Sequence, residues 1–276
     1  MKSAITIPVY KPDLNCYERI SFLQCIKIFS KNHPVFLFGP SNLDISNYLA
    51  IYPSIKYISF ESHYFNNITG YNHLMNNILF YKSFLEYDYI LIYQLDAFVF
   101  NDNLDDWCSK GYDYTGSPWF EDFGRAEKKL WAVGNGGFSL RKTKAFYHLL
   151  SEKINIFNFL KLYKYYQSSL NEKRFKSFIR ALIKGLIIKP QIQNELLNFY
   201  QNEDVFWGLF ADKLFRNFTV CPVYEAVKFS FDLFPEILYE MNNKNLPFGC
   251  HAFNKNLNFW RDYITELNNE NIKRIS

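Results

Sequence analysis

The sequence predicts an α/β fold, a mixed and mostly parallel sheet flanked by helices, with a basic helical insertion. Short apolar runs alternate with longer segments of helical spacing through the first hundred residues, an order typical of parallel strands joined by crossover helices. The run at 89–96 is almost continuously apolar, as a strand covered on both faces requires. Residues 152–200 lack strand-like runs and are rich in lysine and arginine, which indicates the insertion.

The first elements are bounded by clear turn signals. A strand is expected at 4–9, where β-branched residues lead into a turn that contains Pro12 and Asp13. The segment 14–30 carries apolar residues at roughly helical spacing and stops before Pro34, so we expect a helix there. Further strands are expected at 35–40, 55–60 and 89–96, and a further helix at 71–85.

Length and composition indicate a globular protein with a large core. The chain has 276 residues, of which 49% are hydrophobic, 20% aromatic and 21% charged. This apolar content excludes a disordered protein, and we expect one domain over 1–276 with the insertion at 152–200 inside it. The 31 Lys and Arg residues exceed the 27 Asp and Glu residues by only 4. Because no basic stripe accompanies this excess, no nucleic-acid partner is predicted.

Cysteine usage and hydropathy predict a cytoplasmic protein. The five cysteines are scattered and form no C-x-x-C pair, so neither a disulfide framework nor a structural zinc site is indicated. Pro8, Lys11 and Pro12 interrupt the N-terminal region before any apolar stretch reaches the length of a signal-peptide core. No later apolar run approaches the ~18 residues of a membrane span.

The basic insertion contains a predicted amphipathic helix. Apolar residues over 175–187 follow the i, i+3, i+4, i+7 pattern, and Lys176, Arg180 and Lys184 fall on the opposite side. A basic amphipathic helix can lie on anionic lipid, so one interpretation is a peripheral contact with the inner face of the cytoplasmic membrane through 173–189. The alternative interpretation is a helix packed on the domain, with its basic side in solvent.

The first candidate for chemistry is the segment Gln94-Leu95-Asp96. It follows the most apolar run directly, and in parallel sheets ligands bind beyond the carboxyl ends of the strands. A carboxylate next to a buried strand needs a partner for its charge, and a divalent cation is an efficient one. The alternative is that Asp96 only caps the turn into residues 98–100.

The second candidate is the glycine-rich segment 131–141. Gly134, Gly136 and Gly137 remove side chains where a ligand or another part of the backbone comes close, and a strand restarts at Phe138. The spacing is not that of a dinucleotide-binding fingerprint. The alternative is a tight turn in a hairpin.

Two further segments carry titratable side chains. Asn202 can cap a helix whose first turn holds Glu203 and Asp204, which by itself explains the two acids. The functional interpretation is that one of them acts as a general base toward an attacking hydroxyl. His251 lies among aromatic residues after a loop that contains Pro247; a lone histidine of this kind is more often a satisfied structural residue than a ligand.

Taken together, these segments follow the order of parts in glycosyltransferases of the GT-A type. The strings YNHLM, FYKSFLEYDYILIYQLDAFVF, WAVGNGGFSLRK, NEDVFW and GCHAF closely resemble a bacterial glycosyltransferase-like family that is usually labelled only as a domain of unknown function and is often found near surface-polysaccharide genes. The resemblance extends over about 71–260 and leaves the basic insertion outside. It implies a GT-A-like, Rossmann-like fold and a hexosyltransferase-like enzyme that depends on a nucleotide-sugar.

The resemblance also implies roles for the donor and metal side of the site. Asp96 matches the last acid of the D-x-D motif, which binds a metal that bridges the diphosphate of the donor. Gln94 stands where the first acid would be, which puts the ribose or second metal contact in doubt. His251 matches the histidine that completes the coordination of Mn²⁺ or Mg²⁺. The loop with Pro8, Tyr10 and Lys11 matches the place where the base and ribose dock.

The acceptor side follows from the same resemblance. The segment with Trp131, Asn135, Gly136 and Gly137 matches the strand that contacts the acceptor and the sugar. Asp204 matches the catalytic base of inverting members, with Glu203 as the alternative base. The implied acceptor is a glycan or lipid-linked glycan of a capsule or lipopolysaccharide.

Two other classes of protein remain open. A carbohydrate- or nucleotide-sugar-binding protein without catalysis would explain Gln94 and the many Tyr and Trp residues, although aromatic residues also build cores. A metal-dependent hydrolase or nucleotidyltransferase would usually supply more than one acid at the end of the strand. Hydrolysis of the donor without an acceptor would favour this last class, and binding without turnover would favour the first.

Overall fold

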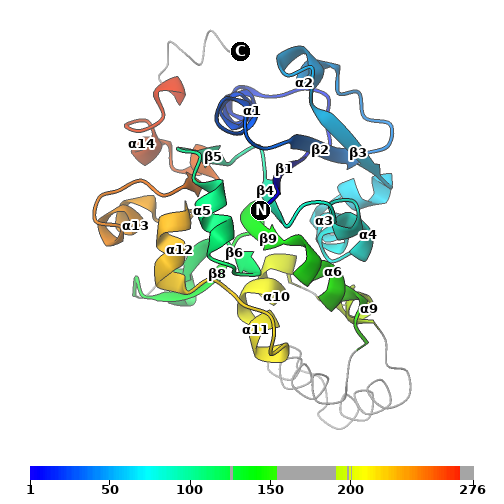
Figure 1. Cartoon of the computed structure of the whole chain (residues 1–276). Helices are drawn as coiled ribbons and strands as arrows, with labels where there is room; N and C mark the ends of the chain where they lie inside the picture. Colours follow the sequence, from blue (N-terminus) through cyan, green and yellow to red (C-terminus); the bar gives the residue numbers. More distant parts are fainter. Residues whose placement is uncertain (125–126, 154–190, 198, 200, 268–276) are drawn as a thin grey trace.

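A six-stranded sheet forms the centre of the computed structural model, which describes residues 1–124, 127–153, 191–197, 199 and 201–267 (Figure 1). Its order is β3-β2-β1-β4-β9-β6, in which the first four strands are parallel, β9 is antiparallel to β4, and β6 is antiparallel to β9. The strands are β1 (Ser3–Pro8), β2 (Val35–Pro40), β3 (Lys56–Phe60), β4 (Tyr89–Tyr93), β6 (Tyr114–Thr115) and β9 (Phe138–Lys142). The predicted mixed and mostly parallel sheet is therefore confirmed.

The order of the strands reverses between β1 and β4. The chain runs from β1 outward to β2 and β3, and then returns to place β4 on the other side of β1, so that Ile5 is paired with both Val35 and Leu91. At such a reversal the loops after the two neighbouring strands leave in opposite directions and open a crevice at their carboxyl ends. The residues after Pro8 and after Tyr93 lie at this point.

Helices cover both faces of the sheet (Figure 1). On one face lie α1 (Cys16–Phe29) and α5 (Leu104–Ser109), and the hydroxyl of Tyr93 donates to the carbonyl of Ser21 at 3.1 Å. On the other face lie α4 (Ile78–Lys82), α6 (Thr143–Ser151) and α10 (Glu203–Leu209). There the ring of Phe146 lies 4.8 Å from that of Tyr81 and 4.3 Å from that of Trp207, between centroids. Burial on both faces explains the continuous apolar run of β4.

The remaining elements surround this core. The helices are α2 (Ser46–Ile51), α3 (Ile68–Met75), α9 (Ile192–Leu196), α11 (Ala211–Leu214), α12 (Val223–Phe229), α13 (Pro235–Met241) and α14 (Leu257–Trp260), with 3-10 turns η1 (Ser62–Phe65), η2 (Glu121–Gly124), η4 (Phe253–Lys255) and η5 (Thr265–Leu267). Two small sheets add β10 (Ser230–Phe231), β11 (Gly249–Cys250) and β5 (Phe98–Val99) in one, and β7 (Ser117–Phe120) and β8 (Leu130–Gly134) in the other.

Two predicted boundaries are wrong. The helix expected at 71–85 is two helices, α3 and α4, because the side chain of Asn77 accepts a hydrogen bond from the backbone of Leu79 at 2.8 Å and starts a new helix. The strand expected at 89–96 ends at Tyr93, since the chain then turns and the amide of Ala97 donates to the carbonyl of Gln94 at 2.9 Å. Asp96 therefore lies in a loop beyond the strand.

The glycine-rich segment does not form a hairpin. The strand before it, β8, pairs with β7, whereas the strand after it, β9, pairs with β4 and β6. The hairpin interpretation is therefore wrong, and residues 135–137 instead carry the chain from one sheet to another. This crossing brings them to the end of β4, where the amide of Gln94 donates to the carbonyl of Gly137 at 2.8 Å.

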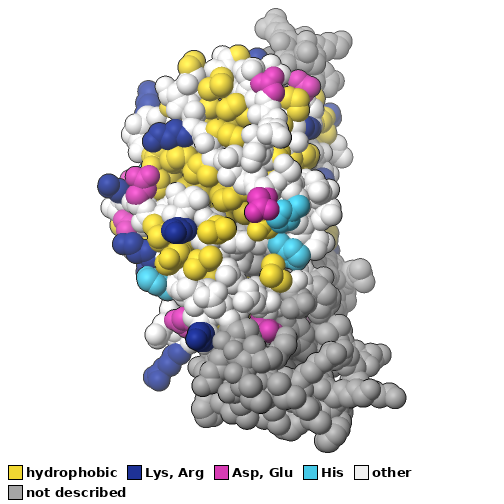
Figure 2. Space-filling view, turned by 90° about the vertical axis from the view of Figure 1, so that its right-hand side faces the viewer, with side chains coloured by type: hydrophobic (Ala, Val, Ile, Leu, Met, Phe, Trp, Pro, Cys, Tyr) yellow, Lys and Arg dark blue, Asp and Glu magenta, His cyan; other side chains and the backbone are white. Residues whose placement is uncertain are grey.

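Residues 154–190, which include the predicted basic amphipathic helix, lie outside the described part of the chain. Within the described part, no helix has the length and hydropathy needed to cross a membrane. On the face seen in Figure 2, several described Lys and Arg side chains lie along one edge, interspersed with Asp and Glu. Residues 154–190 contain eight of the 31 Lys and Arg residues and one of the 27 Asp and Glu residues.

Candidate functional site

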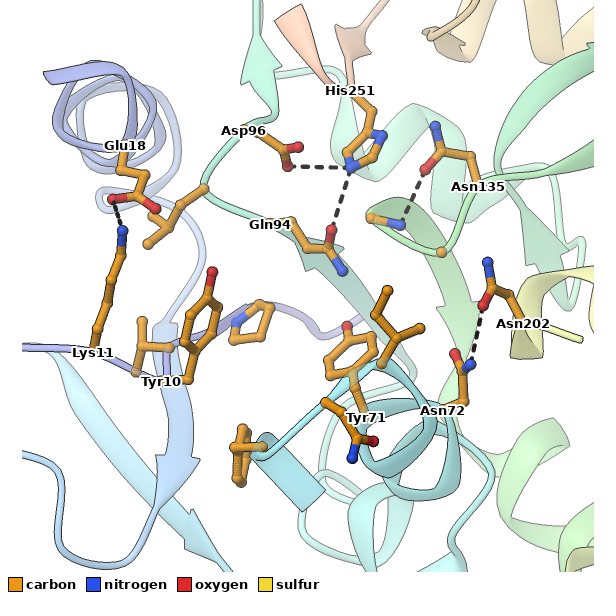
Figure 3. A pocket seen from close by; sticks show the side chains of 18 of the residues that line it. Tyr10, Lys11, Glu18, Tyr71, Asn72, Gln94, Asp96, Asn135, Asn202 and His251 are labelled. Atoms are coloured by element: carbon orange, nitrogen blue, oxygen red, sulfur yellow. Dashed lines mark hydrogen bonds and ion pairs between the residues drawn. The ribbon is translucent and has the colours of Figure 1, made fainter. Parts of the chain in front are cut away.

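A cavity of about 790 Å³ lies at the carboxyl ends of β1 and β4 (Figure 3). It is lined by the loop after β1, the loop after β4, the turn at 135–137, the segment that leads into α3, the start of α10 and the residues after β11. Ligand sites typically have volumes of ~300–1,000 Å³. The position of the cavity, at the reversal of strand order, is where open α/β sheets bind ligands.

The cavity gathers nearly all residues that the sequence singled out. Those that line it are Pro8, Tyr10, Lys11, Gln94, Asp96, Asn135, Gly136, Gly137, Glu203, Asp204 and His251. Trp131 is different: it lies on β8, does not line this cavity, and is 50% exposed. The structure thus does not bring Trp131 to the predicted sugar and acceptor site, because β8 leads away from the turn toward the small β7–β8 sheet.

Three side chains converge on one wall of the cavity. The Nε2 atom of His251 lies 3.1 Å from Oδ1 of Asp96 and 3.2 Å from Oε1 of Gln94 (Figure 3). Gln94 and Asp96 come from the loop after β4, and His251 directly follows β11, held by a backbone hydrogen bond to Phe231 at 2.9 Å. Burial alone would raise the pKa of Asp96, but the hydrogen bond and charge of His251 outweigh it and lower that pKa.

The other ring nitrogen of His251 faces a carboxylate that the sequence analysis missed. Its Nδ1 atom lies 3.5 Å from Oδ1 of Asp232, which is an ion-pair distance rather than that of a short hydrogen bond. Burial lowers the pKa of His251, but the contacts with Asp232 and Asp96 raise it more, to about 9. The parallel pairing of β10 with β11 brings Asp232 beside His251. Only this pairing identifies Asp232 as a neighbour of His251, because the sequence around Asp232 carries no motif that indicates such a role.

The converging atoms fit one side of a divalent cation site. Adjacent ligands of an octahedral ion with bonds of ~2.1 Å are about 3 Å apart, which matches the separations of Nε2 of His251 from Asp96 and Gln94. Mn²⁺ accepts mixed imidazole and oxygen ligands. Among the described residues, no group of three or more His, Cys, Asp or Glu side chains is arranged to hold a metal. Substrate phosphates and water would therefore have to complete the coordination, as they commonly do for Mg²⁺.

The glycines of the turn are required by close packing against these side chains. A Cβ atom on Gly137 would overlap Nε2 of His251 and approach Oε1 of Gln94 to 2.7 Å, and one on Gly136 would overlap a carboxylate oxygen of Glu203. Asn135 has a φ of 68°, and its side-chain oxygen accepts from the amide of Gly137 at 3.1 Å. The turn thus fits between the His251 side and the α10 side of the cavity.

The two adjacent acids of α10 have different surroundings. Oδ2 of Asp204 accepts a hydrogen bond from the amide of Gly136 at 3.1 Å, while its Oδ1 has no hydrogen-bond partner among the described residues. Burial raises the pKa of Asp204, against the opposing effect of that hydrogen bond and of Arg141. Glu203 is almost fully buried and accepts from Nη2 of Arg141 at 2.7 Å. Each acid therefore has one buried carboxylate oxygen without a hydrogen-bond partner among the described residues, Oδ1 of Asp204 and Oε2 of Glu203, and Glu203 differs in being held by Arg141.

Arg141 is a second residue that the sequence analysis passed over. Its side chain is 0% exposed and donates to Glu203, to the hydroxyl of Tyr81 at 2.9 Å and to that of Ser139 at 3.1 Å. A buried guanidinium is tolerated only when it is paired and hydrogen-bonded. The signal that could have identified it is an arginine inside a predicted strand, directly after Leu140.

Basic side chains lie on the side of the cavity near the end of β1. Nζ of Lys11 lies 2.9 Å from Oε2 of Glu18, which also accepts from the amide of Asn15 and so anchors the loop to the start of α1 (Figure 3). Lys255 lines the cavity and lies near enough to lower the pKa of Asp96. Tyr10 is 64% exposed at the mouth of the cavity. This side can neutralise a phosphate and stack against a planar ring.

Comparisons with known proteins give one family model and a set of similar solved structures. The family model described as "Protein of unknown function (DUF5672)" matches residues 54–251. A search of curated proteins found no match. Among solved structures, the galactosyltransferase LgtC, crystallised with donor and acceptor sugar analogues, is 13% identical with a TM-score of 0.49, over 96% of this chain and 94% of that chain.

Two other solved structures are similar to the chain at lower identity. Mouse xyloside xylosyltransferase 1 is 8% identical with a TM-score of 0.48, over 91% of this chain and 97% of that chain. A glycosyltransferase involved in the glycosylation of the major capsid of PBCV-1 is 11% identical with a TM-score of 0.38, over 90% and 93%.

Proposed function

The chain belongs to the family described as "Protein of unknown function (DUF5672)", and we propose that it is a metal-dependent glycosyltransferase that uses a nucleotide-sugar donor. One observation carries this proposal. A single cavity at the reversal of strand order is lined by Asp96, His251 and Gln94, which form a metal-binding wall, and elsewhere by the acid Asp204. A diphosphate leaving group and an attacking hydroxyl need these two kinds of group.

The donor would bind across the β1 side and the metal-binding wall. Pro8 and Tyr10 would contact the base and ribose, and Lys11 and Lys255 would neutralise phosphate charge. Asp96, His251 and Gln94 would hold Mn²⁺ or Mg²⁺. When bound, such an ion supplies positive charge that stabilises the diphosphate as it leaves.

Transfer would take place beside Asp204. The carboxylate of Asp204 would take the proton from the acceptor hydroxyl while the hydroxyl oxygen bonds to the anomeric carbon and the bond from that carbon to the diphosphate breaks. Attack from the face opposite the leaving group inverts the anomeric configuration. A carboxyl with a raised pKa is a stronger base once ionised, and the ion pair of Glu203 with Arg141 makes Glu203 the less available of the two acids.

The resemblance of residues 71–260 to a family found near surface-polysaccharide genes supports the choice of acceptor. We propose a glycan or lipid-linked glycan of a capsule or lipopolysaccharide, which would place the enzyme in the cytoplasm or at the inner face of the cytoplasmic membrane. Asn135, Gly136 and Gly137 would lie against the reacting sugars.

A thermal-shift screen tests the donor class. UDP-, GDP-, CMP- and dTDP-sugars are each added with and without Mn²⁺, because a ligand that binds only the folded state raises the melting temperature by mass action. A shift that requires both the metal and one nucleotide supports the proposal. Folded protein that shows no shift with any of these donors at millimolar concentration would contradict it. Binding without transfer would indicate a binding protein, and release of free sugar without an acceptor would indicate a hydrolase.

The Asp96→Ala variant should lose the Mn²⁺-dependent part of donor binding, because it removes the only carboxylate on the metal-binding wall. At a donor concentration of 100 times the Kd, the wild type gains about 2.7 kcal/mol of stability from the ligand, and we expect most of this gain to disappear. The melting temperature with and without donor and Mn²⁺ measures it. Asp105→Ala, an exposed acid at the start of α5, is the control. Unchanged Mn²⁺-dependent affinity in Asp96→Ala would reject Asp96 as a ligand.

The Asp232→Asn variant should weaken Mn²⁺ binding by about 10- to 100-fold, the usual effect of removing the carboxylate that orients a metal-binding histidine. Asp232 faces Nδ1 of His251, so the proton that the ring must lose to bind a metal leaves from Nε2, on the side of Asp96. Titration of Mn²⁺ followed by electron paramagnetic resonance measures the affinity. Glu236→Gln, an exposed acid in α13, controls for loss of charge. Equal affinities in the two variants would show that Asp232 does not orient the histidine.

A further inference from the structure

One wall of the cavity is lined by amide side chains. Asn66, Asn67 and Asn72 come from the segment between η1 and α3, and Asn202 precedes α10. In Figure 3, Asn72 and Asn202 lie across the cavity from Lys11 and Tyr10, with Asp96 and His251 between the two groups. We call the four asparagines the amide wall. A donor whose base lies at Tyr10 and whose diphosphate lies at Asp96 would place its sugar toward this wall.

The hydrogen bonds within the amide wall leave amide N–H groups for a ligand. Nδ2 of Asn72 donates to Oδ1 of Asn202 at 3.1 Å, and the oxygen of Asn67 accepts from the amide of Gly70 at 2.9 Å. The bonds of Asn67 and Asn202 therefore use their side-chain oxygens and not their NH₂ groups. Beside them, the carboxylate of Asp204 is an acceptor that lines the same cavity; its Oδ1 is buried and has no hydrogen-bond partner among the described residues. Neutral donors next to such an acceptor suit the hydroxyls of a sugar, which both accept and donate.

The charges near the amide wall exclude an anionic sugar. Its charged neighbours in the cavity lining are Glu203 and Asp204, which are both acids, whereas Lys255 lies near Asp96. Arg141 is fully buried and already paired with Glu203. In the part of the chain that the structure describes, no Lys or Arg side chain is therefore available at this wall. A carboxylate or phosphate there would lack a counter-charge and would be repelled by the carboxylate of Asp204.

From the amide wall we infer that the enzyme transfers an uncharged, hydroxyl-bearing hexose and discriminates against uronic acids. This inference rests on the proposed function and specifies its substrate class. The discrimination comes from side chains of one small region, so that a single added positive charge at Asn202 should change it. Asn202 is exposed and its side chain does not cap α10, which makes the site tolerant of substitution.

Calorimetric titration with matched pairs of donors tests the inference. The pairs are UDP-glucose and UDP-glucuronate, UDP-galactose and UDP-galacturonate, and GDP-mannose and GDP-mannuronate, all with Mn²⁺. Within the pair that carries the preferred nucleotide, we expect the neutral sugar to bind at least 10-fold more tightly. Asn202→Lys should reduce this ratio at least 10-fold, and Thr69→Lys, which adds the same charge on α3 outside the cavity lining, should leave the ratio unchanged.

The outcomes distinguish failure of the inferred sugar preference from failure of the proposed glycosyltransferase function. Equal or tighter binding of the uronate by the wild type would overturn the inference and leave the glycosyltransferase proposal intact. An unchanged ratio in folded Asn202→Lys, checked by circular dichroism, would also overturn it, because the sugar would then lie elsewhere. Failure of all six donors to bind, together with no metal-dependent shift for the CMP- and dTDP-sugars of the thermal-shift screen, would contradict the proposed function itself.

Discussion

Substitution of Asp204 by Asn lowers the rate of sugar transfer by about 10²- to 10⁴-fold, the usual contribution of a positioned general base, and leaves donor affinity near that of the wild type. Asn keeps an oxygen for the amide of Gly136 but cannot take a proton at the free position. The single-turnover rate and the donor Kd are measured separately. Asp212→Asn, an exposed acid in α11, is the control. Undiminished transfer in Asp204→Asn would reject Asp204 as the base.

The same variant should not be less stable than the wild type. Burial raises the pKa of Asp204, so the folded state disfavours the ionised carboxylate more than the unfolded state does. The variant should therefore be at least as stable at neutral pH, and this advantage should vanish at acid pH, where the wild-type carboxyl is protonated. For the same reason, wild-type transfer should fall as the pH falls through the raised pKa of Asp204. Thermal unfolding and transfer rates over a pH series measure both effects.

Arg141→Met should lower the free energy of unfolding by about 3–5 kcal/mol, because it leaves Glu203 as a buried charge without a partner. This is a large part of the ~5–15 kcal/mol that stabilises a typical protein. The double variant Arg141→Met/Glu203→Gln removes both charges and should recover much of the loss. Urea unfolding of the wild type, the two single variants and the double variant measures the coupling energy.

Additive losses in that cycle would contradict the interpretation of Arg141 and Glu203 as one buried pair. Lys2→Met, a cationic residue on the exposed N-terminal edge, is the control for loss of positive charge. Because Glu203 is next to Asp204, we also expect transfer to fall in Arg141→Met variants that remain folded. The buried pair thus stabilises the protein and fixes the start of α10 in the cavity wall.

The strands β1 to β4 and the helix α1 are predictable from the sequence because their signals are local. The first strand is followed by a turn with Pro12, and the first helix stops before Pro34. The apolar pattern of each element shows which of its side chains face the core, whichever distant segment lies on the other side of that core. The prediction of a single helix at 71–85 was wrong for a local reason too. Asn77 forms a cap that competes with continuation of the helix, and apolar spacing alone does not reveal it.

The candidate site was predictable in its residue types and not in its contacts. Asp96 was singled out as a carboxylate at the end of a buried strand, whereas the metal role of His251 and the choice of Asp204 over Glu203 came from the resemblance to GT-A glycosyltransferases. Trp131 was chosen by its place in the glycine-rich segment, and the pairing of β8 with β7 carried it away from the cavity. Strand pairing joins residues far apart in the chain, so no local pattern could have indicated this.

The sequence by itself determined the α/β class, the order of the main strands and the residues able to do chemistry, since these follow from local hydropathy and side-chain type. Only the tertiary structure decided which of them meet. His251 lies beside Gln94, 157 positions away, and Glu203 lies beside Arg141, 62 positions away. Such contacts exist because the pairing of β11 with β5 brings His251 to the loop after β4, and because the start of α10 contacts the turn that leads into β9. The roles of Asp232, Arg141 and the amide wall became visible only from these contacts.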